Sequence, residues 1–368
     1  MKIALVHDYI KEYGGAERVL EALTEIYPQA PIYTTVYLPS FLGPHRARFK
    51  NLKIITSKAQ YLPFKSKLIS PLRLIAPSLF KSFDFSKYDV VIVSATGSYI
   101  PNSINKKNAV QISYTHTPPR YLYGYETARD WRKNVFSRAL GILAIHFLRM
   151  WDFTYSKNVD FYIANSKEVQ GRIKKFYRKD STVIYPPVDL PVRASNETTR
   201  EYFLTGGRIA RAKHTDLILD TFIKNGLPLK IFGKGFAGFE SELKDKIQGK
   251  TNIEFLGEVT DEEKFELMKN AKAFIFASQD EDFGITPVEA MANGCPVIAY
   301  KSGGVLESVI ENKTGIFYNE LTINSLSKAI SKFQKLKLKA EDCILQAQKF
   351  SKERFKKEIK EFVESKVK

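Results

Sequence analysis

Short apolar runs alternate with longer amphipathic segments along the first half of the chain. Runs of four or five residues rich in Val, Ile and Tyr have the length and composition of buried strands. They cover residues 3–6, 90–93, 109–113, 161–164 and 182–185. Residues 16–27 have the apolar spacing of a helix and directly follow the loop after the first strand.

The second half repeats this alternation. Strand-like runs cover residues 202–205, 229–232, 253–256, 273–276 and 296–299, a helix is expected over residues 215–224, and a charged amphipathic helix over about residues 340–368. Apolar strands that alternate with helices are typical of parallel sheets covered on both faces. The pattern therefore predicts an α/β fold with two Rossmann-like domains.

A proline-containing and polar stretch separates the two halves. Residues 185–191 include three prolines, and polar residues continue to about Arg200, which indicates a linker. A chain of 368 residues is long enough for two domains at roughly 150 residues each. We predict an N-terminal domain over residues 1–190 and a C-terminal domain over residues 191–349, each able to bury its own core.

Two apolar segments of the N-terminal half are ambiguous. Residues 61–83 mix Leu, Ile and Phe with Lys and Arg, and either form short half-buried helices or an interfacial surface. In the second case the apolar side chains would sink among lipid headgroups while nearby cations meet the phosphates; these cations are Lys65, Lys67, Arg73 and Lys81. Core packing is expected for a second set at helical spacing, namely Phe136, Leu140, Leu143, Phe147 and Trp151.

The charge of the chain is uneven. Lys and Arg number 57 against 40 Asp and Glu, and residues 1–190 hold 28 of these basic residues but only 14 of the acidic ones. No acidic residue lies between Glu25 and Asp84. A one-sided field of this kind attracts an anion, which could be lipid headgroups, nucleic acid or a phosphorylated substrate.

Other features exclude several classes of protein. The two cysteines, Cys295 and Cys343, form neither a metal-binding spacing nor a disulfide framework, which fits a reducing compartment. No apolar stretch approaches 18 residues, and the first apolar run is too short for a signal peptide. We expect a cytoplasmic protein.

Two glycine-containing loops follow the first expected strand of each half. Gly14 and Gly15 could let backbone N–H groups approach a phosphate or a sugar, although a tight turn without ligand explains them equally well. In the second half, Arg208 and Lys213 lie five residues apart in a strand-to-helix loop. Two fixed cations there could neutralise a diphosphate, or could simply be solvated surface charges.

Two further candidates follow later strands. Glu281 and Glu289 flank a glycine-containing turn, and we expect a helix to begin near Pro287, with Glu289 in its first turn. Glu289 could equally be a plain partner of the helix dipole. His116 follows the strand over residues 109–113 and could face a crevice, although a lone histidine is more often structural.

Together these residues resemble a retaining glycosyltransferase of family 4 with the GT-B fold, in which two Rossmann domains face each other across a crevice. The strongest element is Glu281-Asp-Phe-Gly-Ile-Thr-Pro-Val-Glu289, which continues to Ala299 and to the Ser302-Gly-Gly304 turn. The Arg208 to Lys213 loop and two segments after it appear in the family's usual order, namely residues 231–235 and 255–261. The resemblance covers nearly the whole chain.

The resemblance implies roles for matching residues. Arg208 and Lys213 would bind the donor diphosphate, Glu289 the ribose, and Glu281 would face the transferred sugar. Phe283, Gly284 and Ile285 would offer backbone contacts, and Val259 would lie near the base. Gly14 and Gly15 would line the crevice. His116 would contact the sugar, and the helix over about residues 350–368 would cross back to the first domain. His214 departs from the Gly or Arg that the family more often has after the lysine.

The closest resemblance in motifs is to bacterial mannosyltransferases that build O-antigen and exopolysaccharide from GDP-mannose. It implies a retaining, metal-independent transfer in which GDP-mannose is a co-substrate and no cofactor is required. The acceptor would be a glycan or a lipid-pyrophosphate-linked sugar at the inner face of the cell membrane, met by the basic N-terminal domain. A UDP-sugar-dependent transferase with a soluble acceptor, a sugar-nucleotide epimerase and a nucleic-acid-binding protein are the alternatives.

Overall fold

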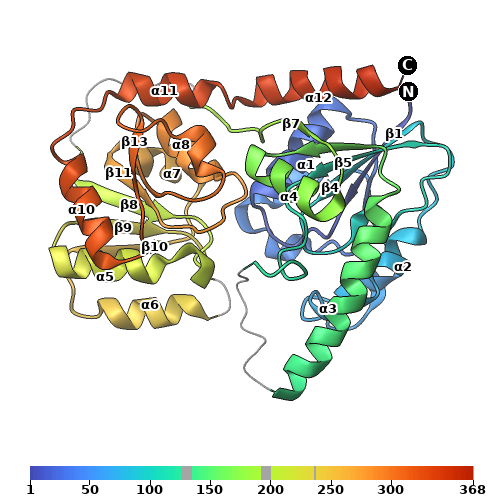
Figure 1. Ribbon diagram of the computed structural model, residues 1–368, viewed down its shortest axis with the longest axis horizontal. Helices are drawn as coiled ribbons and strands as arrows, with labels where there is room; N and C mark the ends of the chain where they lie inside the picture. The colour runs from blue at the N-terminus through green and yellow to red at the C-terminus, as the bar shows by residue number, and fades with distance from the viewer. Residues whose placement is uncertain (126–134, 192–199, 236–237, 368) are drawn as a thin grey trace. The chain divides into compact units, whose positions relative to one another are not determined.

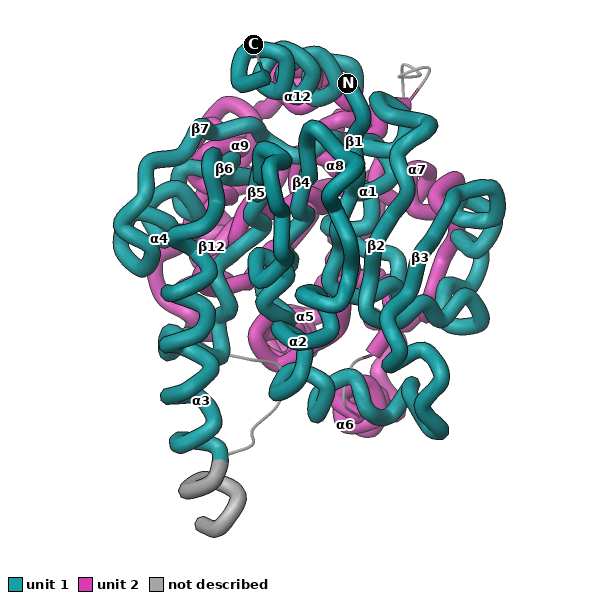
Figure 2. Tube along the Cα trace, turned by 90° about the vertical axis from the view of Figure 1, so that its right-hand side faces the viewer, with its two compact units in different colours: residues 1–126, 130–187, 353–368 teal, residues 127–129, 188–352 magenta. Residues whose placement is uncertain are grey.

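The computed structural model describes residues 1–125, 135–191, 200–235 and 238–367. The chain divides into two compact units (Figures 1 and 2). Unit 1 comprises residues 1–126, 130–187 and 353–368, and unit 2 comprises residues 127–129 and 188–352. The last helix therefore belongs with the N-terminal part of the chain, and each unit contains its own parallel sheet.

Unit 1 is built on a seven-stranded sheet in the part of the chain that the structure describes. Every pairing is parallel and the strand order is β3-β2-β1-β4-β5-β6-β7. The strands are β1 (Ile3–His7), β2 (Ile32–Thr34), β3 (Ile54–Thr56), β4 (Val90–Ala95), β5 (Val110–Thr115), β6 (Phe161–Ala164) and β7 (Thr182–Val183). From β1 the chain continues to β2 and β3 on one side of β1. It then returns to form β4 on the other side of β1, so the strand order reverses between β1 and β4.

Helices cover both faces of this sheet (Figure 1). They are α1 (Gly15–Ile26), α2 (Ala76–Lys81), α3 (Val135–Ser156), α4 (Lys167–Tyr177) and α12 (Lys352–Lys366). The C-terminal helix α12 buries Phe355, Ile359 and Val363, which follow each other at helical spacing and join the core that contains Leu5 of β1. The Phe355 ring meets the Tyr114 ring of β5 edge-on, with 5.7 Å between the ring centroids, so α12 packs on the sheet itself.

Unit 2 repeats the arrangement on a smaller scale. Its six-stranded sheet, counted over the described residues, is also parallel in every pairing, in the order β10-β9-β8-β11-β12-β13. The strands are β8 (Tyr202–Gly206), β9 (Leu229–Phe232), β10 (Ile253–Gly257), β11 (Ala271–Phe276), β12 (Val297–Tyr300) and β13 (Gly315–Tyr318). The helices are α5 (Thr215–Asn225), α6 (Phe239–Ile247), α7 (Asp261–Lys269), α8 (Ile285–Ala292), α9 (Val305–Ser308), α10 (Ile323–Phe333) and α11 (Ala340–Gln348). The order reverses between β8 and β11.

The predicted α/β fold with two Rossmann-like sheets is confirmed. Each predicted strand overlaps an observed one, but the sequence pattern missed β2, β3 and β13, which have only three or four residues. The single C-terminal helix expected over about residues 340–368 is wrong, because residues 349–351 interrupt it and separate α11 from α12. Part of the predicted linker, residues 192–199, lies outside the described residues.

Helix α3 contradicts the expectation of a buried apolar stripe. Leu143, Phe147 and Trp151 are exposed, at 56%, 48% and 42%, whereas Leu148 on the opposite side is buried against Ile100 and Leu122. The side chains of Phe136 and Leu140 lie outside the described residues. The predicted helix is present, but the face that contains Leu148 packs against the unit, and the predicted face is exposed. Both faces carry apolar residues, so the spacing did not identify the buried one.

Residues 61–83 form short helical turns and α2, as the half-buried alternative predicted. One set of side chains is buried under the turns, including Leu72 and Phe80. Another set is exposed, and comprises Tyr61, Leu62, Phe64, Leu74 and Ile75. The segment is therefore half-buried, and its outer side presents apolar side chains among lysines and arginines.

Candidate functional site

The candidate residues of unit 2 follow the two strands between which the strand order reverses. Arg208 and Lys213 come after β8, and Glu281 comes after β11. Parallel neighbours end at the same edge of a sheet, and in open α/β sheets this reversal is where ligands bind. The topology alone therefore brings these residues to one edge of the sheet.

Lys213 and Glu281, 68 residues apart in the sequence, are in direct contact through Nζ and Oε2. The hydroxyl of Ser278 donates a hydrogen bond to the same carboxylate oxygen at 2.5 Å. The Lys213 ammonium also lies 5.8 Å from the centre of the Phe276 ring, at the end of β11. Both side chains of the ion pair retain some exposure, so the pair is accessible to a ligand.

Close backbone packing fixes the loop that carries Glu281. The backbone N–H of Gly304 donates to the carbonyl oxygen of Glu281 at 2.8 Å, and the Ser302 hydroxyl accepts from the N–H of Asp280 at 3.1 Å. A Cβ on Gly303 or Gly304 would lie about 2.4–2.5 Å from this loop's backbone, which no side chain could tolerate. The Ser302-Gly-Gly304 turn is therefore a support for the Glu281 loop.

Helix α8 begins directly after this loop. Gly284, with φ +88°, precedes its first residue, Ile285, and Phe283 is buried against Phe350 with 5.4 Å between the ring centroids. The helix starts two residues before Pro287, so Glu289 is its fifth residue and not in its first turn as predicted. Its first turn carries no acidic side chain, which leaves the positive end of the helix dipole for an anionic ligand.

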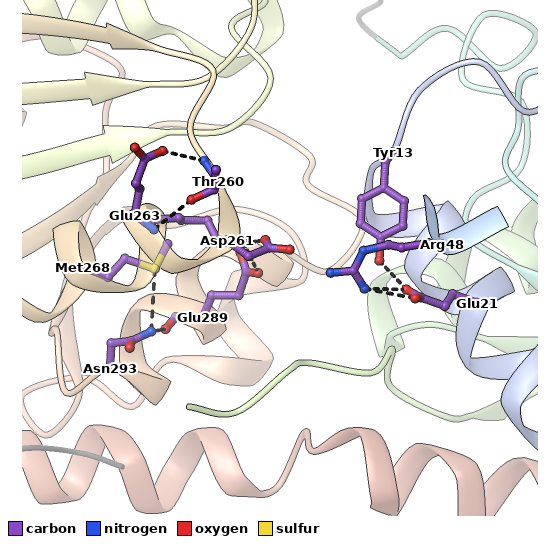
Figure 3. A network of polar contacts seen from close by, with 10 residues as sticks. Tyr13, Glu21, Arg48, Thr260, Asp261, Glu263, Met268, Glu289 and Asn293 are labelled. Atoms are coloured by element: carbon purple, nitrogen blue, oxygen red, sulfur yellow. Dashed lines mark hydrogen bonds and ion pairs between the residues drawn. The ribbon is translucent and has the colours of Figure 1, made fainter. Parts of the chain in front are cut away.

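Glu289 lies in a buried polar network with α7. Lys264 donates to Glu289 Oε1 and to Asp261 Oδ1, at 2.8 Å in both cases, and its side chain is only 9% exposed. Figure 3 shows Asp261 and Glu289 together with the Thr260–Glu263 capping box that starts α7 and follows Val259. Lys264 could not be recognised from the sequence, because 25 residues separate it from Glu289 and it lies in an ordinary charged helix.

The loop after β8 has two notable residues besides Lys213. Arg208 is exposed in this loop. His214, where the resembling family more often has Gly or Arg, adopts a left-handed conformation with φ +48° at the junction of a short 3-10 turn and α5. Glycine adopts this conformation without steric cost, whereas histidine does not, so the departure from glycine adds strain at this position.

In unit 1, polar residues also gather at the strand reversal. Asp8 follows β1, and its carboxylate accepts hydrogen bonds from the Thr96 hydroxyl and from the backbone N–H groups of Ser98 and Tyr99, at 3.1 Å for the last two. These three residues follow β4, the strand beside β1. Asp8 is fully buried, and burial raises the pKa of its carboxyl above the usual range.

His116 follows β5 and is also buried. Its Nε2 lies 2.9 Å from Ser94 Oγ on β4, and that hydroxyl lies 3.1 Å from Nδ1 of His7 on β1. Burial, together with the neighbouring His7, lowers the pKa of His116 to about 3. His116 is therefore a neutral imidazole at physiological pH, suited to a hydrogen bond and unsuited to an ion pair with phosphate.

The glycine loop of unit 1 is anchored on both sides. The N–H of Gly14 donates to Glu17 Oε2 at 2.9 Å, and Glu17 Oε1 lies 3.5 Å from His7 Nε2. The Tyr13 hydroxyl donates to Glu21, which Arg48 also contacts at 2.9 Å (Figure 3). Gly15, the first residue of α1, is exposed. The loop is thus held in place and leaves its glycine backbone accessible.

Comparisons with known proteins agree with this arrangement. The family described as "Glycosyltransferase Family 4" matches residues 13–191, and "Glycosyl transferases group 1" matches residues 191–350. The chain is a GT-B glycosyltransferase. Together the two family matches extend from residue 13 to residue 350, so they include all the candidate residues described above.

The glycosyltransferase is similar to eukaryotic proteins named alpha-1,3/1,6-mannosyltransferase ALG2. The mouse protein is 25% identical over 95% of this chain and 93% of its own length, and that of Dictyostelium discoideum is 26% identical over 68% of each. Among solved structures, it resembles sucrose-phosphate synthase from Thermosynechococcus elongatus (TM-score 0.71, 16% identity, 99% of each chain). It also resembles Anabaena HepE in complex with UDP and glucose (TM-score 0.69, 17% identity, 99% and 100% covered).

Two further features of the described residues concern metal ions and membranes. No group of three or more His, Cys, Asp or Glu side chains in this part of the chain could hold a metal ion. None of the helices described is both long and apolar enough to cross a bilayer.

Proposed function

We propose that this glycosyltransferase moves mannose from GDP-mannose onto a lipid-linked or oligosaccharide acceptor in bacterial surface polysaccharide synthesis, with retention of the anomeric configuration. The observation that carries this proposal is the contact of Lys213 with Glu281 beside the start of α8. It combines a cation for the diphosphate with a carboxylate for the sugar. The names of the ALG2 relatives favour mannose as the transferred sugar.

Lys213 and Arg208 would neutralise the charge that grows on the leaving diphosphate. Both belong to the loop after β8, and the first turn of α8 adds the partial positive charge of its N–H groups. Fixed cations and oriented dipoles of this kind stabilise a leaving group without reorganisation, and one such donor is typically worth about 100-fold to 1000-fold in rate. The transfer then needs no metal ion.

Glu281 would face the sugar while Glu289 holds the ribose. Glu281 already accepts from Lys213 and Ser278, which makes it an acceptor fixed in place and a poor candidate for a covalent nucleophile. We therefore favour substitution on the front face of the sugar, in which the departing phosphate takes the proton of the incoming acceptor hydroxyl. Backbone groups of Phe283, Gly284 and Ile285 would hold sugar hydroxyls.

The donor is tested by thermal-shift measurements with GDP, UDP, ADP and dTDP and their sugars. GDP and GDP-mannose are expected to stabilise the enzyme most. Stabilisation by UDP-sugars instead would favour the alternative of a UDP-sugar-dependent transferase, for which the HepE complex with UDP and glucose is a structural parallel. The Glu281→Ala variant should bind the nucleotide but lose transfer, and transfer at the wild-type rate would exclude Glu281 from the mechanism.

Unit 1 would meet the acceptor at the anionic inner face of the cell membrane. The excess of positive charge lies in residues 1–190, and the exposed apolar row on α3 supports contact with lipid. That row comprises Ile142, Leu143, Phe147, Met150 and Trp151. An amphipathic helix of this kind lies in the headgroup region with its apolar side chains inward, while lysines and arginines meet the phosphates.

Vesicle flotation tests this contact. The enzyme is expected to float with vesicles of phosphatidylcholine and phosphatidylglycerol at low salt, and less with phosphatidylcholine alone. The double variant Phe147→Gln/Trp151→Gln should reduce the bound fraction at least threefold, whereas Leu345→Gln, which removes a more exposed apolar side chain from α11 of unit 2, should not. Binding to DNA instead of vesicles would favour the nucleic-acid-binding alternative, and equal binding by both variants would exclude α3.

A further inference from the structure

A continuous row of buried polar groups runs across the sheet of unit 1. It starts at Glu17 in the first turn of α1, crosses His7 on β1 and Ser94 on β4, and ends at His116 after β5. His7 and Ser94 are fully buried, and His116 is only 8% exposed. These four residues lie up to 109 positions apart in the sequence, and the parallel register of β1, β4 and β5 brings them together.

Each contact in this row restricts where a proton can sit. Histidine nitrogens that share a hydrogen bond with a hydroxyl must alternate between donor and acceptor, because the hydroxyl has one proton to give. Ser94 Oγ lies between His7 Nδ1 and His116 Nε2, so it donates to one ring and accepts from the other. The tautomer of His7 therefore sets the tautomer of His116.

Glu17 selects one of the two arrangements. Its carboxylate accepts the Gly14 N–H through Oε2 and presents Oε1 to His7 Nε2 at 3.5 Å, an electrostatic contact longer than a full hydrogen bond. A carboxylate favours a proton on the nitrogen that faces it. With Nε2 of His7 protonated, its Nδ1 accepts from Ser94, and Ser94 in turn accepts from Nε2 of His116. The row then contains one carboxylate and two neutral rings, the arrangement with the fewest buried charges.

We infer that Glu17, His7 and Ser94 are positioning residues that keep Nδ1 of His116 unprotonated, as a hydrogen-bond acceptor for a sugar hydroxyl. His116 is the ring that the resemblance brings to the sugar, so this inference rests on the proposed function for its last step. The row also links the two N-terminal candidates, because Glu17 caps the helix that begins at the Gly14–Gly15 loop. One carboxylate thus fixes both the glycine loop and the histidine.

The tautomer can be measured in the free enzyme without any substrate. The chain has five histidines, so selective ¹⁵N-histidine labelling gives a small set of two-bond ¹H–¹⁵N correlations, which distinguish protonated from bare ring nitrogens. The His116→Gln variant assigns the signal. In the wild-type enzyme we expect His116 to carry its proton on Nε2.

The Glu17→Gln variant should invert this tautomer of His116 through the three contacts that separate the two residues. The amide oxygen keeps the Gly14 N–H, so the cap is retained and the NH₂ group faces His7 Nε2. His7 must then accept at Nε2 and donate from Nδ1, Ser94 donates to His116 Nε2, and the proton of His116 moves to Nδ1. The same tautomer in the wild-type enzyme and in this variant would overturn the inference.

Ser94→Ala is the second arm, in case the first variant does not fold. It should leave His116 as a mixture of tautomers and lower kcat/KM about tenfold, the effect of one buried hydrogen bond. Ser94→Thr, which restores the hydroxyl, should recover most of the activity. The matched control is Ser113→Ala, which removes an equally buried hydroxyl from β5 that contacts Thr115 at 3.1 Å and should change neither measurement.

These outcomes separate the inference from the proposed function. If no sugar nucleotide binds, the proposed function fails, and the NMR measurement still shows whether the row sets the tautomer. If GDP-mannose is used but Ser94→Ala and Ser113→Ala have the same activity and the same His116 signals, the proposed function remains and the inference fails.

Discussion

The two units hold their buried carboxylates by opposite means. In unit 2, Glu289 and Glu281 each contact a lysine ammonium, Lys264 and Lys213 respectively. In unit 1, the buried Asp8 accepts from a hydroxyl and two backbone N–H groups, and Asp152 of α3 accepts from two tyrosine hydroxyls. Ion pairs thus hold the two glutamates of unit 2, and neutral donors hold these two aspartates of unit 1.

The difference matches what each unit would bind. Paired charges that keep some exposure can exchange partners when an anion arrives, so unit 2 suits a diphosphate whose charge increases during the reaction. A buried, largely neutral network cannot compensate a charged ligand, but it can direct hydroxyl groups with fixed donors and acceptors. Unit 1 therefore suits the uncharged hydroxyls of a sugar.

The largest effect is expected from Lys213→Ala. Removing the cation from the Glu281 contact should lower transfer about 100-fold to 1000-fold, because the growing charge on the diphosphate loses a fixed partner. Initial rates with saturating GDP-mannose measure it. Arg211→Ala is the matched control: Arg211 stands two residues away and contacts Glu242 at 2.6 Å, but both side chains are about half exposed, so a change under threefold is expected. Equal losses in both variants would contradict a special role for the ion pair of unit 2.

The next largest effect concerns stability. Lys264→Met keeps the length of the side chain but removes the ammonium from two carboxylates, of which Glu289 is only 4% exposed. Breaking a buried ion pair on one side costs about 3 kcal/mol or more in the free energy of unfolding. Urea denaturation measures the loss, and the double variant Lys264→Met/Glu289→Gln should recover part of it. No recovery would mean that packing, and not charge, makes Lys264 important.

The two sheets and the site segments of unit 2 could be predicted from the sequence. Strand and helix periodicity identified the two sheets, because buried parallel strands are continuous apolar runs. The segments after β8 and β11 are predicted as sites because Arg208, Lys213 and Glu281 lie in short, glycine-containing loops, and Glu289 follows in the helix after the second loop. The resemblance supplied their roles.

What the sequence missed depends on contacts between distant segments. Lys264 reaches Glu289 from another helix, and Ser94 reaches His7 across 87 positions, and neither pairing leaves a local spacing. The prediction of the buried face of α3 was wrong for a different reason. Its apolar residues extend around most of the helix, so periodicity predicted a stripe but could not tell which side would pack.

Asp152 of unit 1 should make the free energy of unfolding depend on pH in an unusual direction. Burial raises the pKa of Asp152 to about 7, although the Tyr123 and Tyr177 hydroxyls oppose the shift. The folded protein then keeps a proton on this carboxyl between about pH 4 and 7, where the unfolded chain has lost it. The free energy of unfolding therefore decreases as the pH rises through this window, and becomes constant with respect to this group above it.

Asp152→Asn should remove that contribution. An amide can keep both tyrosine contacts without a charge, so the variant is expected to be more stable than the wild-type protein by about 2 kcal/mol at pH 8 and by little at pH 4. Urea denaturation at several pH values measures the difference. Asp180→Asn, which changes a carboxylate with a fully solvated side chain, should leave the pH dependence as it is. Parallel stability curves for Asp152→Asn and the wild type would place Asp152 with the charged carboxylates of unit 2.

The smallest effect tests the loop that carries Lys213. His214 has φ +48° and ψ +40°, a left-handed conformation that costs an L-residue about 1 kcal/mol and glycine almost nothing. His214→Gly is expected to raise the free energy of unfolding by about 0.5 kcal/mol, since part of the gain is lost to the greater freedom of the unfolded chain. His214→Ala retains the strain and should be about 0.5 kcal/mol less stable than the glycine variant. If alanine and glycine are equally stable, the backbone at this position is relaxed, and the histidine side chain itself must maintain the loop that presents Lys213 to Glu281.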